Sequence, residues 1–178
     1  MVEKVSVWKA NLNSGLIMGL IGVVYSLVIY FLDLTFNSIQ GFVLLAILIF
    51  LLFYLIKSYR DNYLHGYITY GQSLGAGVVI FLYYSIIMAI FTYILYKFID
   101  TGLTAKVLAF TEERLVNRGR MPQQAIDAAM TIKKKIMIPE IMAPGSILNN
   151  MFSGTIISLI VSIFTRIEGN PLMDAPSN

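Results

Sequence analysis

The side chains that carry most enzyme chemistry are scarce in this sequence. It contains no cysteine and a single histidine, His65. Without thiols the chain cannot form a disulfide, a thiolate nucleophile, an iron–sulfur cluster or a cysteine-based zinc site. A metal centre or haem that needs several imidazole ligands is excluded by the same count. We therefore expect no metal, no cofactor and no catalytic residue of these kinds.

The charged residues do not form a recognisable catalytic or nucleic-acid-binding set. Glu112 and Glu113 are adjacent in the sequence, so on a helix they would point to different faces, and a hydrolytic pair has no support. The run from Lys133 to Lys135 is typical of a solvated face or of a contact with lipid headgroups. Nucleic-acid binding needs a clustered basic face, and a net charge of +3 is small. We expect a protein that is not an enzyme and binds no nucleic acid.

The glycine-rich segment Gly71-Gln-Ser-Leu-Gly75-Ala-Gly77 is not a nucleotide-binding loop. It lacks the Gly-Lys-Ser/Thr ending of a phosphate-binding loop, and no strand precedes it. The four-residue spacing of its first two glycines matches instead the motif by which membrane helices pack closely.

The composition indicates that lipid is the solvent for most of the chain. Of 178 residues 57% are hydrophobic and 13% are charged, and the mean hydropathy is +0.74. Soluble domains are typically about 25% charged. A helix that crosses a bilayer needs about 20 mostly apolar residues. Four segments meet this requirement without a charged residue in their interior, and they are residues 13–32, 40–56, 70–98 and 146–164.

The sizeable polar stretch, residues 101–145, lies between the third and fourth of these spans. Apolar residues at helical spacing predict two short amphipathic helices, with Gly119 at the end of the first and Pro122 at the start of the second. Pro139 and the Pro144-Gly145 pair are expected to end the second helix. A hairpin this short buries little by itself, so we expect it to rest on the membrane surface or on a partner.

The fold class predicted from these elements is an all-α membrane protein. It has four transmembrane helices, with an amphipathic helical hairpin between the third and the fourth. All of it forms a single membrane domain over residues 1–178. No Asp, Glu, Lys, Arg or His lies in the interior of a span, which argues against proton coupling, voltage sensing and charged substrates.

Small residues recur at four-residue spacing on the first, third and fourth spans. They let helix backbones approach closely and gain dispersion contacts, where no hydrophobic effect operates between helices. The second span consists mainly of bulky residues, and we expect its Leu48 to face lipid. Packing within the chain and a homodimer seam both fit the pattern. The residues expected to pack are Gly15, Gly19, Gly22, Gly71, Gly75, Gly154 and Ser158.

The basic residues that set membrane orientation are divided between the two sides. Cytoplasmic connections collect Lys and Arg, and the first helices usually dominate insertion. Lys4 and Lys9 precede the first span, whereas the connection 33–39 has no basic residue. We therefore expect both termini to be cytoplasmic. This choice places eight basic residues outside against five inside, so the opposite orientation is the alternative. The eight are Lys97, Lys106, Arg114, Arg118, Arg120, Lys133, Lys134 and Lys135.

Four segments resemble a bacterial membrane-protein family, the domain of unknown function number 4199. They are Val5-Ser-Val-Trp8-Lys9-Ala-Asn-Leu-Asn-Ser-Gly15-Leu-Ile-Met-Gly19, Lys57-Ser-Tyr-Arg60-Asp61, Gly66-Tyr-Ile-Thr-Tyr-Gly71-Gln-Ser-Leu-Gly75 and Phe98-Ile-Asp100. The resemblance covers about residues 3 to 165. It implies the inner membrane of a Gram-negative bacterium and the same plan of spans and hairpin. The family has no assigned activity, so the resemblance implies no functional residue.

Two classes of function fit these observations. The first is a non-enzymatic accessory, assembly or scaffold subunit of a larger envelope membrane complex. The second is a small oligomeric transporter or channel for neutral or lipidic molecules. A lipid-modifying enzyme comes third, because it would need a cluster of His, Asp or Glu. The expected partners are membrane lipids and either other membrane subunits or further copies of this chain.

Overall fold

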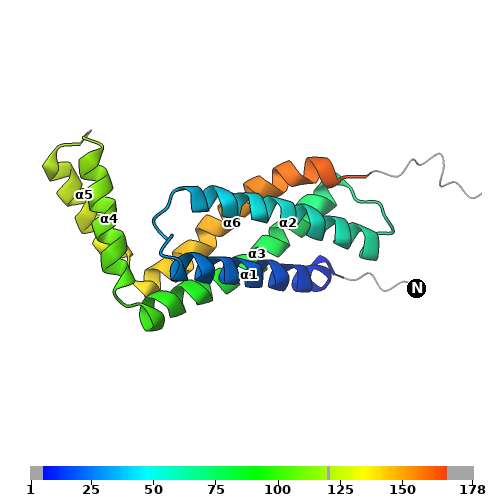
Figure 1. Cartoon of the computed structure of the whole chain (residues 1–178). Coiled ribbons are helices and arrows are strands. Elements are labelled where there is room, and N and C mark those ends of the chain that lie inside the picture. Colours follow the sequence, from blue (N-terminus) through cyan, green and yellow to red (C-terminus); the bar gives the residue numbers. More distant parts are fainter. Residues whose placement is uncertain (1–5, 120, 168–178) are drawn as a thin grey trace, which may run out of the picture.

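The computed structural model describes residues 6–119 and 121–167, and within them the chain is helical (Figure 1). The elements are α1 (Val7–Phe31), α2 (Ile39–Tyr63), α3 (Tyr70–Ile94), a π-helical turn η1 (Leu95–Ile99), α4 (Leu103–Asn117), α5 (Gln123–Ile136) and α6 (Pro139–Thr165). Four helices are long and apolar enough to cross a membrane, namely α1, α2, α3 with η1, and α6. The predicted fold class, all-α with four membrane-spanning helices, is therefore confirmed.

The helices extend beyond the apolar segments from which they were predicted. α1 begins six residues before the predicted start at residue 13, and α2 continues seven residues past the predicted end at residue 56. Counting apolar residues locates the part of a helix inside lipid, but polar turns at either end can stay helical until a breaking conformation occurs. After α2 that break comes at His65 and Gly66, whose φ angles are +54° and +88°.

The start of α6 was predicted wrongly. α5 ends at Ile136, just before Pro139, as predicted, but α6 begins at Pro139 rather than near residue 146 and carries the Pro144-Gly145 pair inside it. Proline at a first helical position loses no hydrogen bond. Pro144 leaves the carbonyl of Glu140 without a helical donor, and Glu140 is exposed, so water can hydrate that group. The ion pair between Glu140 and Lys97 joins this first turn of α6 to η1, which continues α3.

The third helix is the centre of the bundle, because α3 packs against both α1 and α6 along its length. α2 contacts the other helices less and closes one side of the bundle. Met18, Ile80 and Phe81 are at most 1% exposed and form the middle of the core. The prediction that Leu48 faces lipid is wrong, since Leu48 is 7% exposed and belongs to this core. A span made of bulky residues on all sides gives no sign of which face turns inward.

The two ends of the bundle differ (Figure 1). The start of α1, the α2–α3 connection and the end of α6 lie at one end, which we call the terminal end. There, two backbone hydrogen bonds of 2.9 and 3.0 Å pair Ile68 with Ile167. The α1–α2 connection lies at the other end, where α4 and α5 pack against each other and project away from the spans. We call α4 and α5 the hairpin, and this end the hairpin end.

Candidate functional site

The three glycines predicted to pack on α1 lie against α3. A methyl group at Gly15 would overlap the side chain of Tyr83, and one at Gly19 would overlap Ile87. At Gly22 it would lie 2.7 Å from Cε2 of Tyr84, which is closer than carbon atoms can approach. Each of these positions therefore accepts only a hydrogen atom as its side chain.

The predicted residues of α6 also lie at a close helix crossing. A methyl group at Gly154 would overlap the ring of Phe81. Ser158 lies beside Gly77, and a methyl group added at Gly77 would come 2.6 Å from Oγ of Ser158. The Ser158 hydroxyl donates a 2.7 Å hydrogen bond to the carbonyl of Gly154. The crossing of α3 and α6 is thus built from small residues on both helices.

Two of the predicted packing residues, Gly71 and Gly75, do not lie at any crossing in the described part of the chain. Nothing is within 4 Å of a methyl group placed on either one. With about 3.6 residues per turn, Gly71 and Gly75 share a face, and Gly77 lies on the nearly opposite one. Spacing alone cannot show which of these two faces turns inward. The residue of this segment that packs closely is Gly77, which the spacing motif did not select.

A cluster of buried hydroxyl groups joins α3 to α6 near the terminal end. Oγ of Ser73 is 3.1 Å from Oγ of Ser162 and 2.6 Å from Oγ1 of Thr165. All three side chains are at most 2% exposed. Their hydrogen bonds satisfy one another, so the cluster serves helix packing and leaves no free group for chemistry. The cluster was not predicted from the sequence, although the serines at positions 158 and 162 lie four residues apart and mark the face of α6 involved.

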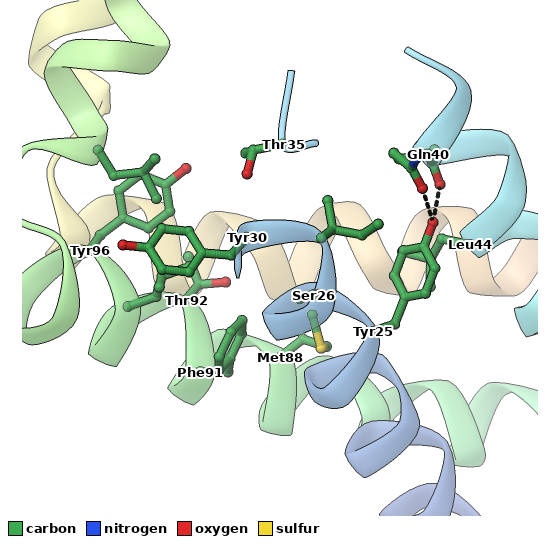
Figure 2. Close-up of a pocket in the computed structure, with 14 residues that line it drawn as sticks. Tyr25, Ser26, Tyr30, Thr35, Gln40, Leu44, Met88, Phe91, Thr92 and Tyr96 are labelled. Atoms are coloured by element: carbon green, nitrogen blue, oxygen red, sulfur yellow. Dashed lines mark hydrogen bonds between the residues drawn. The ribbon is translucent and has the colours of Figure 1, made fainter. Parts of the chain in front are cut away.

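A cleft of about 260 Å³ lies among α1, α2 and α3 near the hairpin end (Figure 2). Side chains of both apolar and uncharged polar type surround it. They are Tyr25, Ser26, Ile29, Tyr30, Thr35, Gln40, Gly41, Leu44, Met88, Phe91, Thr92, Leu95, Tyr96 and Leu103. Residues from α1, α2, α3, η1, α4 and the α1–α2 connection contribute, so this cleft is the strongest candidate for a binding site.

The α1–α2 side of the cleft is fixed by one tyrosine. The Tyr25 hydroxyl donates to Oε1 of Gln40 at 2.7 Å and also lies 2.9 Å from the backbone carbonyl of Gln40 (Figure 2). This contact ties the end of α1 to the first turn of α2. It also orients the Gln40 amide at the edge of the cleft.

The other end of the cleft is closed by a polar contact with the base of the hairpin. The Tyr30 hydroxyl donates to Oδ2 of Asp100 at 3.2 Å, and Nζ of Lys106 lies 3.0 Å from the same oxygen. The Asp100 side chain is 13% exposed. Hydrogen bonding and charge from Lys106 hold the pKa of Asp100 below its ordinary value of 3.8, and the carboxylate raises the pKa of Lys106. Asp100 thus links α1 to α4 as an anion.

We expect Asp100→Asn to lower the melting temperature in detergent at neutral pH by a few degrees, because the link between α1 and α4 loses its charge. The effect should depend on pH. A depressed carboxyl pKa stabilises the fold above the unfolded value, near 3.8, and this contribution is lost as the pH falls through the folded value. The difference between the two proteins should therefore be constant near neutrality and disappear in strong acid.

The control for this experiment is Asp127→Asn, on the exposed face of α5. Asp127 accepts a hydrogen bond from Gln123, one turn away on the same helix. Its substitution should leave the melting temperature unchanged at every pH. If Asp100→Asn had the same melting temperature as wild type at neutral pH, the Asp100 carboxylate would have no part in holding the hairpin.

The residues considered for chemistry in the sequence lie apart from one another. His65 is in the α2–α3 connection at the terminal end, whereas Glu112 and Glu113 are exposed on α4. Lys133 donates to Thr111 across the hairpin. Within residues 6–119 and 121–167, no group of three or more His, Cys, Asp or Glu could hold a metal ion.

Comparison with known proteins gives one match. The model of the family described as "Protein of unknown function (DUF4199)" matches residues 13–166, from the first half of α1 to the end of α6. No curated protein and no solved structure matches the chain. The family match covers the four spans, the hairpin and every residue that lines the cleft.

Proposed function

The chain belongs to the DUF4199 family of proteins of unknown function, and we propose that this integral membrane protein is a non-enzymatic accessory or assembly subunit of a larger envelope membrane complex. The resemblance to a bacterial family favours the inner membrane as its location, with both termini in the cytoplasm. Lipids would surround the spans, and the partners would be other membrane subunits.

The observation that carries this proposal is the apolar surface of the hairpin. Ile132 and Ile136 lie one turn apart on α5 and are 63% and 52% exposed. Val116 and Met121, near the tip, are about half exposed as well. These residues lie outside the four helices that are long and apolar enough to span a membrane. Exposed apolar side chains that a chain does not cover itself are typical of a surface that meets a partner.

The interior of the bundle supports the same proposal. The core between the spans is filled by Met18, Ile80 and Phe81, and glycines bring α1 and α6 close to α3. A transport pathway through a single copy would have to displace these side chains. A transporter would therefore need several copies arranged around a pathway, which an accessory subunit does not.

Purification from native membranes with identification of bound proteins tests this function. We expect wild type to carry one or more membrane proteins in stoichiometric amount. The double variant Ile132→Ser and Ile136→Ser should lose at least tenfold of that partner, since about 1.5 kcal/mol of lost apolar burial corresponds to about tenfold in affinity. Gln124→Ser, an exposed polar change on the same helix, is the matched control.

Other outcomes of this purification would overturn the accessory role. A lone oligomer with a central cavity would favour the second class, a transporter or channel for neutral or lipidic molecules. That class has one observation in its favour, the uncharged cleft among α1, α2 and α3. Loss of membrane-surface binding by the hairpin variant, without loss of any protein, would assign the apolar surface to lipid.

A further inference from the structure

We propose that the cleft among α1, α2 and α3 binds an uncharged lipid that carries a hydroxyl group, with diacylglycerol as its chemical type. The hydroxyl end would lie between Gln40 and Thr92, and the acyl chains would leave the cleft towards the surrounding bilayer. This binding site goes beyond the accessory role and does not depend on it.

The position of the cleft suits the glycerol level of a bilayer. It lies beside the last turns of α1 and the first turn of α2, next to the α1–α2 connection (Figure 2). Tyr25, Tyr30 and Tyr96 gather there, and tyrosine favours the boundary between hydrocarbon and headgroups. The walls formed by Leu44, Met88 and Phe91 are apolar and could accompany the first part of an acyl chain.

The charge of the site selects against ionic headgroups. Every side chain that lines the cleft is uncharged. The carboxylate nearest to it, Asp100, is bound by Tyr30 and by the ammonium of Lys106. A phosphate would find no cation among the lining side chains, and a cation would find no anion there, while the adjacent Asp100 is already paired with Lys106. An uncharged ligand is therefore the one the electrostatics match.

The directions of the hydrogen bonds select a ligand that can donate. Tyr25 gives its hydroxyl hydrogen to Gln40, and Tyr30 gives its hydrogen to Asp100. Both phenol oxygens can then only accept a further bond. A glycerol hydroxyl supplies the missing donor. A quinone carries only acceptors: the Gln40 amide and the Thr92 hydroxyl could donate to it, but the two phenol oxygens would be left without a donor.

The size of the cleft agrees with a small polar end rather than a whole ligand. Pockets that enclose a drug-sized molecule hold about 300–1,000 Å³, and this cleft holds about 260 Å³. A glycerol group and the start of two acyl chains fill a space of this order. The rest of such a lipid would lie along the outer surface of α2, where Phe42 and Phe50 are exposed.

Quenching of a single tryptophan by brominated lipids tests the proposal. The chain has one tryptophan, Trp8, so Trp8→Phe with Phe91→Trp places the only indole in the cleft. The protein would be reconstituted in phosphatidylcholine nanodiscs that contain increasing amounts of brominated diacylglycerol or of phosphatidylglycerol with the same brominated chains. We expect saturable quenching by diacylglycerol, with a midpoint at least fivefold lower than for phosphatidylglycerol.

Binding-site variants and a surface control make the result specific. Gln40→Leu and, separately, Thr92→Val should each raise the diacylglycerol midpoint about fivefold, as expected from the loss of one hydrogen bond. Phe152→Trp in the Trp8→Phe background reports the bulk bilayer, because Phe152 is 71% exposed on α6, a helix that contributes no residue to the cleft. At this control position, brominated diacylglycerol and phosphatidylglycerol should quench the tryptophan equally and in proportion to their amount.

Two outcomes would overturn the proposal. Quenching at position 91 that matched the pattern at position 152 would mean that lipids reach the cleft without selection. Saturable quenching by an added isoprenoid quinone, with none by diacylglycerol, would assign the site to a ligand that only accepts hydrogen bonds. If Phe91→Trp lowered the melting temperature, Met88→Trp would report from the same cleft.

Discussion

The substitution Gly154→Leu is expected to prevent the bundle from assembling, and even Gly154→Ala should lower its free energy of unfolding by about 1–3 kcal/mol. The reason is the crossing of α3 and α6, where a methyl group at Gly154 would overlap the ring of Phe81. Phe81 is 1% exposed and has no space into which it could turn. Expression level and melting temperature in detergent measure the effect.

Gly145→Ala on the same helix is the matched control. A methyl group there has no neighbour within 4 Å, so the change should be neutral or slightly stabilising, because alanine favours a helix over glycine by about 0.5–1 kcal/mol. Gly77→Ala and Gly75→Ala form a second pair on α3, where only Gly77 meets Ser158. Equal melting of the two members of either pair would show that the crossing is not close.

A second substitution should restore part of the loss. Phe81→Leu shortens the side chain that Gly154→Ala would strike, so the double variant should be more stable than Gly154→Ala alone. Residues in direct contact are expected to deviate from additivity in this way. Purely additive losses would place the damage of Gly154→Ala in the helix itself rather than in its packing against α3.

The spans were predictable because their signal is local. A run of about 20 apolar residues defines a membrane helix without reference to any other part of the chain. The inward face of a membrane helix cannot be predicted in the same way, because lipid and a protein core are both apolar. Spacing therefore selected Gly71 and Gly75, which meet nothing, and left out Gly77, which does. For the same reason Leu48 was expected to face lipid, although it is buried.

The cleft could not be predicted, because its parts are far apart in the sequence. Tyr25 and Gln40 are separated by 15 residues, and Tyr30 and Asp100 by 70. Each residue has an ordinary local explanation, an aromatic belt for the tyrosines and a helix end for Asp100. The start of α6 was missed for a related reason. Its first turn is joined to η1 by the ion pair of Lys97 and Glu140, a contact that proline-based rules do not consider.

The orientation of the chain can be decided by an all-or-none experiment. The described chain has no cysteine, so a single introduced thiol reports one position. We expect Met121→Cys at the tip of the hairpin to react with a membrane-impermeant thiol reagent in spheroplasts. Asn62→Cys, at the terminal end of α2, should react only after the membrane is opened. Met121 is preferable to Gly119, whose φ of +59° would strain any other residue.

The expectation follows from the way the first helices insert. Lys4 and Lys9 precede α1, and the α1–α2 connection has no basic residue, which favours a cytoplasmic N-terminus. Because the hairpin and the α1–α2 connection lie at the same end of the bundle, labelling at position 121 reports the side of both. The eight basic residues between positions 97 and 135 argue against this orientation, because it places them outside the cytoplasm.

The reverse labelling pattern would mean that the charge of the hairpin outweighs the first helix. The hairpin would then lie in the cytoplasm, where anionic lipids attract basic side chains by about 1 kcal/mol for each charge near the surface. Lys134 and Lys135 are exposed on α5 beside the apolar pair Ile132 and Ile136. In that orientation the same surface would favour the membrane over a protein partner, so the labelling result also decides which partner the hairpin variants should lose.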